Sequence, residues 1–366
     1  MARALALETL IKQDISLNGP MPISKFMSYA LNHNKDSYYK AQSPIGNVGD
    51  FITAPEISQL FGEIIGIWCA NYWHIENKPK KIKLIELGPG KGTLMSDLLR
   101  ATKNIVGFHD AIEICLVEIN TSLIEEQKKN IKYHNIEWFS SYDEIPQDCI
   151  SIIIANEFFD ALPIEQYIKR KDVWYINMVN IKQEMEYLCV TKQPVISDVK
   201  EFLAAKYQHV QEGGIVEIND ESSILIKKIS LNLQKNGGIM LLIDYGYLEH
   251  PSRTFISTLQ SLKNHKFNPL FNNIGSADIT AHVNFSTLLE IAEFYGAKAY
   301  GPISQRSFLQ NMHIDLRKDM LIATASAEQQ EDILSGYNRL INTEQMGELF
   351  KVLAISGKEI NDYIGF

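Results

Sequence analysis

A chain of 366 residues with 45% hydrophobic and 22% charged residues can bury a sizeable core, which excludes wholesale disorder. Its net charge of -9 argues against broad nucleic-acid binding, because such binding depends on lysines and arginines that neutralise phosphates. The four cysteines are far apart and form no C-x-x-C pair, so the spacing fits neither a zinc site nor a disulfide framework.

The N-terminal part of the chain is expected to be helical. Residues 1–50 predict one or two helices and then a loop rich in Tyr, Gly, Asn and Ser. A clear helix start follows, because Thr53 and Glu56 have the T-x-x-E spacing of a capping box and Pro55 fits the first turn. The first residues resemble neither a signal peptide nor a transit peptide, and no apolar run is long enough for a membrane span. We therefore expect a complete, cytosolic protein.

From residue 82 the pattern changes to strands that alternate with helices such as Thr93–Ala101 and Ser222–Asn232. The expected strands are Ile82–Leu87, Ile112–Val117, Ile136–Phe139, Ile150–Ala155, Ile215–Ile218 and Ile239–Ile243. Those that begin at residues 82, 150 and 239 are continuous apolar runs, which is typical of parallel strands buried on both faces. The alternation predicts right-handed crossovers and an α/β fold with a doubly wound, mostly parallel, Rossmann-like sheet.

Residues 164–212 interrupt this alternation, and we interpret them as an insertion with a hairpin at residues 173–187 and a helix at residues 196–208. A long loop is expected at residues 245–282, and helices dominate from Phe285 to the end. The predicted domains are an N-terminal helical segment (residues 1–75), a core (residues 76–163 and 213–366) and an inserted subdomain (residues 164–212).

A glycine-rich loop lies between the strand at residue 82 and the following helix, and its key residues are Glu86, Gly88, Gly90 and Gly92. Its glycines permit a tight turn and let a ligand approach backbone N–H groups at a helix N-terminus. A dinucleotide-binding loop has G-x-G-x-x-G spacing, whereas the third glycine here comes one residue early, which disfavours an NAD(P) dehydrogenase. The pattern E-x-G-x-G-x-G resembles motif I of class I S-adenosylmethionine (SAM) methyltransferases, in which the acid helps to hold the methionine ammonium.

A second element matches this loop, because Glu118 ends the next strand. A carboxylate at that position can accept hydrogen bonds from both ribose hydroxyls, and a solvent-exposed glutamate is the alternative. The adenine is expected near Trp138 and Phe139, although core packing is an equal alternative for Trp138. Asn156, at the next strand end, completes the predicted cofactor contacts.

Further segments resemble the MidA family, methyltransferase-like proteins whose mitochondrial members assist assembly of respiratory complex I. The matching segments are residues 49–58, 61–63, 156–163, 243–246, His265, 277–285 and 346–351. Their combination spans about residues 38 to 354 and is highly specific. Asn284 departs from the family pattern, which commonly has Asp there, so a role that needs a negative charge at this position is in doubt.

The resemblance implies a class I methyltransferase fold with extra helical elements, SAM as the cofactor, and a protein arginine as the acceptor. In the mitochondrial members that arginine lies on a core complex I subunit, so a complex I subunit is the expected partner. The absence of a transit peptide points to a bacterial, cytoplasmic relative, and its oligomeric state stays open, a homodimer included. The alternatives are a small-molecule N- or O-methyltransferase, since fold does not fix substrate, and an assembly chaperone that binds SAM without turnover.

Carboxylates near the strand ends are the candidates for binding a cationic acceptor, because they can hold a guanidinium through bidentate hydrogen bonds. The candidate catalytic residues are Glu157, Asp160 and Asp244. The candidate substrate-side residues are Asp50, Tyr245, His265 and His282. The non-functional alternative is a helix-capping or loop-exposed role for the acids and a structural role for the histidines. We expect the segment before residue 76 to fold over the cofactor site, and the histidine spacing predicts no metal site.

Overall fold

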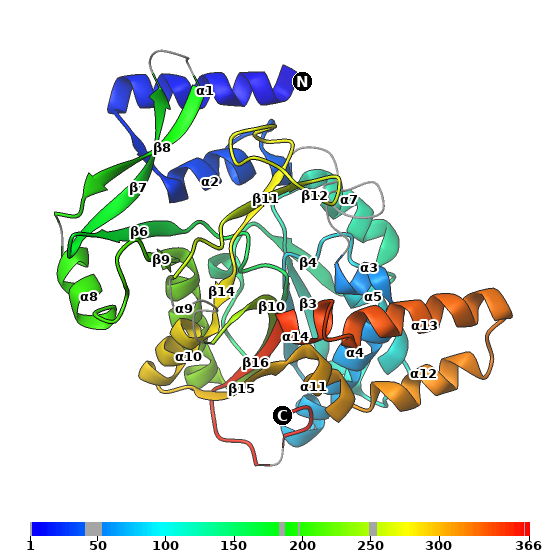
Figure 1. Cartoon of the computed structure of the whole chain (residues 1–366). Helices are drawn as coiled ribbons and strands as arrows, with labels where there is room; N and C mark the ends of the chain where they lie inside the picture. The colour runs from blue at the N-terminus through cyan, green and yellow to red at the C-terminus, as the bar shows by residue number, and fades with distance from the viewer. Residues whose placement is uncertain (1, 41–52, 183–186, 197, 249–254, 362) are drawn as a thin grey trace. The chain divides into compact units, whose positions relative to one another are not determined.

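The computed structural model describes the whole chain except residues 1, 41–52, 183–186, 197, 249–254 and 362 (Figure 1). By its internal contacts the chain divides into two compact units. The small unit consists of Met1–Pro44, Asp160–Ser223 and Glu249–His282, and the large unit of Ile45–Phe159, Ile224–Leu248 and Val283–Phe366. The three predicted domains group the chain differently and stay a prediction.

The large unit is built on an eight-stranded sheet, in which five neighbouring strands are parallel and extend to one edge. The strand order is β15 (Lys298–Ser304), β16 (Phe350–Ser356), β10 (Gly238–Tyr247), β5 (Ser151–Asn156), β2 (Ile82–Leu87), β3 (Ile112–Val117) and β4 (Ile136–Phe139), with β14 (Val283–Asn284) beside β10. Every residue of β2, β5 and β10 is buried, as continuous apolar runs require. This confirms the predicted α/β fold with a largely parallel sheet.

Two strands of this sheet lie in the region where helices were expected. β16 pairs antiparallel with β10 on one side and with β15 on the other. The sheet therefore continues in antiparallel order beyond its parallel strands. The sequence FKVLAIS of β16 is a short apolar run, and periodicity alone does not distinguish such a run from a buried helical segment. In β15 a Gly-Pro pair interrupts the pattern, and the register shifts between Tyr300 and Ile303.

Helices of the large unit precede, connect and follow these strands. They are α3 (Ala54–Ile57), α4 (Gln59–Ile75), α5 (Thr93–Thr102), α6 (Phe108–Ala111), α7 (Thr121–Asn130), α9 (Asp220–Asn236, which begins in the small unit), α10 (Phe285–Phe294), α11 (Gln305–Asn311), α12 (Ile314–Ile322), α13 (Ala327–Ile341) and α14 (Met346–Leu349), with a 3-10 turn, η2, at Tyr142–Glu144. α4 packs closely on α5, because a Cβ added at Gly66 would lie 2.9 Å from the backbone of Leu98. Asn284 caps α10 by accepting a hydrogen bond from Thr287 N at 3.3 Å, a role that Asp and Asn both fill.

The small unit contains an antiparallel sheet and a three-stranded sheet. The first has the order β1 (Met21–Pro22), β7 (Val173–Lys182), β6 (Glu165–Arg170) and β9 (Ile215–Ile218), with β8 (Tyr187–Pro194) beside β7. The second has the order β12 (Lys266–Phe267), β11 (Gln260–Lys263) and β13 (Asp278–Thr280). Its helices are α1 (Ala2–Asn18), α2 (Ile23–Asn32) and α8 (Val199–Lys206), with the 3-10 turn η1 at Tyr38–Lys40.

Two expectations for this unit need correction. β9 is a strand, but it pairs antiparallel with β6 and does not belong to the parallel sheet. Residues 245–282 are not one long loop, because they contribute β11, β12 and β13. The short polar strands β11 and β12, with sequences QSLK and KF, have no apolar alternation that would reveal them. The predicted hairpin is present as β7 and β8.

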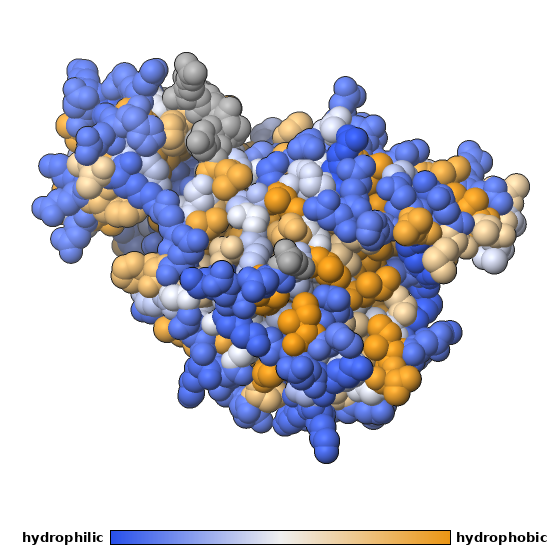
Figure 2. All heavy atoms as spheres, turned by 90° about the horizontal axis from the view of Figure 1, so that it is seen from below, coloured by the Kyte–Doolittle hydropathy of each residue, from blue (hydrophilic) through white to orange (hydrophobic). Residues whose placement is uncertain are grey.

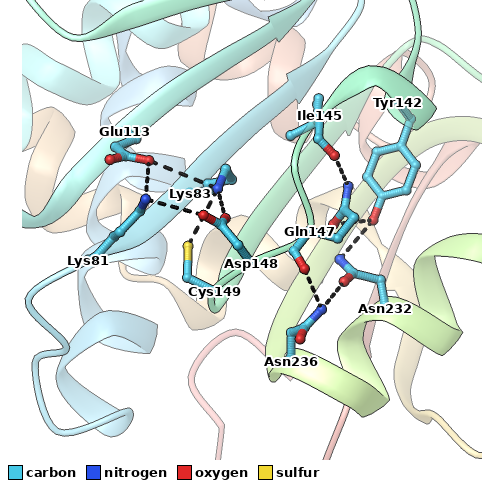
Figure 3. A network of polar contacts seen from close by, with 10 residues as sticks. All are labelled: Lys81, Lys83, Glu113, Tyr142, Ile145, Gln147, Asp148, Cys149, Asn232 and Asn236. Atoms are coloured by element: carbon cyan, nitrogen blue, oxygen red, sulfur yellow. Dashed lines mark hydrogen bonds and ion pairs between the residues drawn. The ribbon is translucent and has the colours of Figure 1, made fainter.

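Ion pairs hold the amino edge of the parallel sheet (Figure 3). Lys83 on β2 is 4% exposed, and its ammonium pairs with Asp148, which directly precedes β5. Lys81 bridges Glu113 at 3.2 Å and Asp148 at 3.4 Å. The hydrogen bond from Lys83 lowers the pKa of Asp148 to about 2, so this carboxylate stays ionised at ordinary pH values. These ion pairs link β2 to the residues that precede β5.

A second polar network in the same view ties α9 to the turn before β5. Asn232 Nδ2 donates to Tyr142 Oη at 2.9 Å, and Asn236 Nδ2 donates to the carbonyl of Gln147 at 3.2 Å (Figure 3). On the face drawn in Figure 2, groups of hydrophobic residues are separated by hydrophilic ones. In the described part of the chain, no helix has both the length and the apolar character to cross a bilayer.

Candidate active site

The glycine loop turns at the carboxyl end of β2. Gly88, Gly90 and Gly92 have φ angles of 65°, 53° and 79°, the left-handed region that glycine adopts without a steric penalty. The amide of Gly88 donates to the carbonyl of Val117 at 3.1 Å, which joins the loop to the end of β3. Gly92 is the N-cap of α5, so the loop leads directly into a helix N-terminus, as predicted.

A pocket lies over this loop, between α3 and the end of β5. It is lined by Thr53, Pro55, Glu56, Glu86, Gly88, Pro89, Gly90, Lys91, Thr93, Leu94, Asn156 and Glu157. Five predicted site residues are thus brought together, namely Glu86, Gly88, Gly90, Asn156 and Glu157. Three carboxylates and one lysine among the lining residues make this a pocket suited to a cationic ligand group.

Glu86 has a carboxylate that the surrounding protein does not satisfy. The residue is 3% exposed, and its Oε2 atom has no hydrogen-bond partner among the described residues. Burial raises the pKa of Glu86 to about 8. Glu63 on α4 is also fully buried, but it pairs with Arg100 and with Arg317, the latter at 2.6 Å. An orphaned buried oxygen is unfavourable unless a ligand pairs with it, so Glu86 points to a cation in the pocket.

Glu118 lies at the end of β3 and is held in place from two sides. Its Oε1 accepts from Asn120 N at 2.8 Å and its Oε2 from Gln127 Nε2 at 3.3 Å. Burial raises the pKa of Glu118 to about 7, although these hydrogen bonds oppose the rise. The half-buried Trp138 and Phe139 end the neighbouring strand β4, as predicted, and they pair in register with Leu116 and Val117.

Gln127 on α7 connects these predicted residues, although it was not among them. Its Nε2 also donates to the carbonyl of Gly90 at 2.7 Å, and its Oε1 accepts from Trp138 Nε1 at 2.8 Å. A glutamine inside a short helix with no motif of its own gives no local signal. It becomes visible only when the strand register places Gly90, Glu118 and Trp138 around it.

The capping box predicted at Thr53 and Glu56 does not form. Thr53 is the N-cap of α3, but its side chain makes no capping hydrogen bond. Instead, Glu157 Oε1 accepts from Ala54 N at 2.9 Å. Glu56 accepts a hydrogen bond from Thr93 and pairs with Lys91 at 3.6 Å. The Thr93 hydroxyl and the Lys91 ammonium thus bind the Glu56 carboxylate, which a capping box would have directed to the backbone of Thr53. These contacts and the one to Glu157 link α3 to the residues that line the pocket.

The turn after β5 carries Glu157 in an unusual conformation. Its φ angle of 51° is left-handed, which costs a non-glycine residue on the order of 1 to 3 kcal/mol. Asp244 stabilises this turn, because its Oδ2 accepts from Phe158 N at 3.2 Å and from Phe159 N at 3.0 Å. Asp244 is 0% exposed, and its predicted catalytic role stays a prediction.

The remaining candidates lie elsewhere. Tyr245 is buried in the large unit, and its ring packs on Phe350 at a centroid distance of 5.6 Å. Asp160, His265 and His282 belong to the small unit. His265 is exposed at the turn between β11 and β12, and its substrate-side role stays a prediction. Asp50 lies outside the described residues. The described residues contain no group of three or more His, Cys, Asp or Glu side chains arranged to hold a metal ion.

Residues 64–303 match the family model of S-adenosyl-L-methionine-dependent methyltransferases. The chain belongs to this family. Among curated relatives, the mitochondrial protein arginine methyltransferase NDUFAF7 of Xenopus tropicalis is 32% identical over 97% of this chain and 86% of its own. The human protein of the same name is 31% identical over 93% of this chain and 81% of its own.

Solved structures agree with this assignment at the level of the fold. A Burkholderia thailandensis protein bound to S-adenosyl-homocysteine superimposes with a TM-score of 0.87 at 24% identity, covering 100% of this chain and 95% of its own. A native structure of a protein from the same organism gives a TM-score of 0.84 at 25% identity, covering 98% and 94%. The fold is that of the class I methyltransferases, the protein is a SAM-dependent methyltransferase, and the resemblance to the MidA family is confirmed.

One prediction is overturned by these relatives. The chain was expected to be a bacterial, cytoplasmic protein because its first residues do not resemble a transit peptide. The curated relatives that it matches over most of its length are mitochondrial proteins by name, so that expectation is not supported.

Proposed function

We propose that the protein transfers a methyl group from SAM to an arginine of a protein substrate, a subunit of respiratory complex I, and that the pocket over the glycine loop is where SAM binds. The observation that carries this proposal is the orphaned carboxylate of Glu86 within a pocket formed by left-handed glycines. The names of the relatives, which are protein arginine methyltransferases, support the choice of acceptor.

The residues present fit SAM. Glu86 would hold the methionine ammonium. This cation would give Oε2 the hydrogen-bond partner that the described residues do not provide. Gly88 and Gly90 would let the cofactor approach the backbone, and Gly92 directs the N-terminus of α5 toward it. Glu118 would accept hydrogen bonds from the ribose. The adenine-side contacts remain assigned to Trp138 and Phe139, which end the adjacent strand, and Asn156 completes the set.

When bound, SAM supplies a methyl group on a sulfonium, which is already a good leaving group, so the protein mainly has to orient the acceptor and exclude water. Glu157 is the candidate to bind the acceptor guanidinium, because it lines the same pocket as Glu86. Its carboxylate is oriented by Ala54 N and by Asn156 Nδ2, the latter at 3.4 Å. A charge-assisted pair would concentrate electron density on one nitrogen, and Glu157 would take the proton that this nitrogen loses.

Two neighbours support this arrangement. Asp244 fixes the turn that carries Glu157, through the amides of Phe158 and Phe159. The ring of Phe158 lies against the loop, since a Cβ added at Gly88 would meet it at 2.9 Å. Asp160 remains a second candidate for the acceptor side, on the residues following this turn.

The test is to incubate the protein with methyl-labelled SAM and an unassembled complex I subunit, and to map the label by fragmentation mass spectrometry. We expect label on arginine. Label on lysine, or only on a small metabolite, would favour a small-molecule or other methyltransferase on the same scaffold. No label on any client, together with normal complex I assembly by the Glu157→Gln variant, would favour a chaperone that binds SAM without turnover.

A further inference from the structure

Three segments of the proposed SAM pocket are joined by a single side chain. Gln127 on α7 is 0% exposed and contacts the glycine loop at Gly90 O, the ribose-side carboxylate of Glu118 and the indole of Trp138. The loop follows β2, Glu118 follows β3 and Trp138 lies on β4, so the contacts span three neighbouring strands. We propose that Gln127 is a positioning residue that sets the affinity for SAM by fixing the spacing of these three segments.

The chemistry of the amide fits this task. Its NH2 group faces two acceptors, Gly90 O at 2.7 Å and Glu118 Oε2 at 3.3 Å, and its oxygen faces one donor, Trp138 Nε1 at 2.8 Å. A flipped amide would set NH2 against the indole N–H and oxygen against two oxygens, so the network allows only one orientation. Only a side chain with both a donor group and an acceptor in this fork satisfies all three partners at once.

The position of Gln127 beneath the loop adds a steric contribution. A Cβ added at Gly92 would lie 3.3 Å from Gln127 Cγ and 2.8 Å from Ile131 Cδ1, so the loop rests directly on α7. α7 itself is anchored at its start, because Asn120 Oδ1 accepts from Ser122 N at 2.8 Å. Asn120 N in turn donates to Glu118, so helix, carboxylate and loop form one connected frame.

Gln127 also affects the charge state of its neighbour. Burial raises the pKa of Glu118, and the hydrogen bond from Gln127 is one of the contacts that lower it. An ionised Glu118 is the stronger acceptor for ribose hydroxyls. Loss of the Gln127 amide would therefore shift the glycine loop and would also make Glu118 a weaker hydrogen-bond acceptor. Because Gln127 has no place among the residues proposed to contact the acceptor, the effect should fall on SAM binding and not on transfer.

This inference rests on the proposed SAM pocket, and the experiment separates the two. The variants are Gln127→Leu, which removes all three contacts, and Gln127→Glu, which keeps an acceptor for Trp138 but loses both donor contacts. We expect the KM for SAM to rise about 10- to 100-fold in both, with kcat at saturating SAM changed less than about twofold. The indole N–H resonance of Trp138, identified by its loss in Trp138→Phe, should shift in Gln127→Leu.

The matched control is Gln305→Leu. Gln305 is also 0% exposed and donates to a backbone carbonyl, that of Leu340 at 2.9 Å, but it lies on α11 away from the pocket lining. We expect this variant to lose stability without a change in the KM for SAM. If Gln127→Leu does not fold, Gln127→Glu decides.

A folded Gln127 variant with wild-type KM, alongside a Gly90→Val variant that no longer binds SAM, would overturn the role of Gln127 and leave the pocket standing. Unchanged SAM binding in Gly90→Val would instead overturn the pocket itself. An equal rise in KM for Gln305→Leu would show that the effect reflects general loss of stability, and would also overturn the proposal.

Discussion

Two glutamates of the large unit show how a functional carboxylate differs from a structural one. Glu63 and Glu86 are both almost completely buried. Two arginines satisfy Glu63, whereas Glu86 Oε2 has no partner among the described residues and the pKa of Glu86 rises to about 8. Such a buried, unpaired group lowers the stability of the free protein, and a bound ligand cation would stabilise it. The unpaired oxygen of Glu86 therefore indicates a ligand ammonium at this position.

SAM binding should release protons near neutral pH. With a pKa of about 8, Glu86 is mostly protonated in the free protein at pH 7, and a bound ammonium favours the ionised form. We expect release of up to about one proton from this group per SAM bound. Affinity should rise with pH between about 6 and about 7.5, below the range where the cofactor's own amino group titrates.

Calorimetry in two buffers of different ionisation enthalpy measures this release. The variant Glu86→Gln should bind SAM weakly and release less, whereas Glu125→Gln, an exposed glutamate of α7, should behave as wild type. Proton uptake on binding, or equal release by wild type and Glu86→Gln, would contradict the assignment.

The same residue should make the stability of the free protein depend on pH. Its folded pKa, about 8, lies above the ordinary value of 4.5, so its stabilising contribution is complete below 4.5 and is lost as the pH rises through about 8. Glu86→Gln should therefore gain stability over wild type on going from low to high pH. The difference is at most about 5 kcal/mol, since a shift from 4.5 to about 8 spans about 3.5 pKa units and each unit corresponds to about 1.4 kcal/mol. Urea unfolding at both ends of the range measures it, and a parallel pH dependence of the two proteins would rule out this cause.

The glycine loop and Glu118 give a further pair of variants. Gly90 has a left-handed φ of 53° and lines the pocket, so Gly90→Val should abolish SAM binding. Glu118→Ala removes two proposed hydrogen bonds to the ribose and should cost about 1 to 3 kcal/mol of SAM affinity. Titration calorimetry gives both values, with circular dichroism to check the fold. Binding of NAD by the wild type would argue against the whole assignment.

At the scale of elements, α3 depends on close packing by α13. A Cβ added at Gly336 would lie 2.9 Å from the carbonyl oxygen of Ile57, so only glycine lets α13 approach the end of α3. Gly336→Ala should destabilise the protein by about 1 to 3 kcal/mol, although alanine is the better helix former. The exposed neighbour Ser335→Ala should be neutral in the same unfolding measurement. A stabilised Gly336→Ala protein would show that α13 can move away from α3 without cost.

Five strands of the large sheet could be predicted from the sequence to within a few residues. β2, β3 and β4 have the expected bounds, and β5 and β10 overlap their predictions. β9 was found as a strand but assigned to the wrong sheet, because four residues do not determine which partner a strand selects. β15 and β16 were missed because long-range pairing, and not local pattern, defines them.

The site shows the same division. Glu86 and the glycines carry a local motif and lie where the motif predicts. Gln127 and the link from Glu56 to Thr93 depend on contacts between segments 37 residues apart in sequence, and no local pattern reveals them. The capping box at Thr53 failed for this reason, since its glutamate found a tertiary partner.

At the scale of the whole molecule, the sheet order explains why the site lies where it does. β2 has β3 on one side and β5 on the other, so the strand order reverses direction at β2. Loops at the carboxyl ends of strands around such a point form a crevice for ligands. The pocket residues Glu86, Gly90, Asn156 and Glu157 follow or end β2 and β5, at that edge. The opposite edge is closed by the ion pairs of Lys83 and Asp148.

SAM affinity and methyl transfer, measured side by side in wild type and Glu157→Gln, test whether Glu157 binds the acceptor. The amide keeps the oxygen that accepts from Ala54 N, so α3 and SAM affinity should be nearly unchanged. Loss of the charge that orients the guanidinium should lower transfer to an arginine-containing client at least about tenfold. Equal transfer by both proteins would remove Glu157 from the mechanism, and loss of SAM binding in the variant would place it with the cofactor instead.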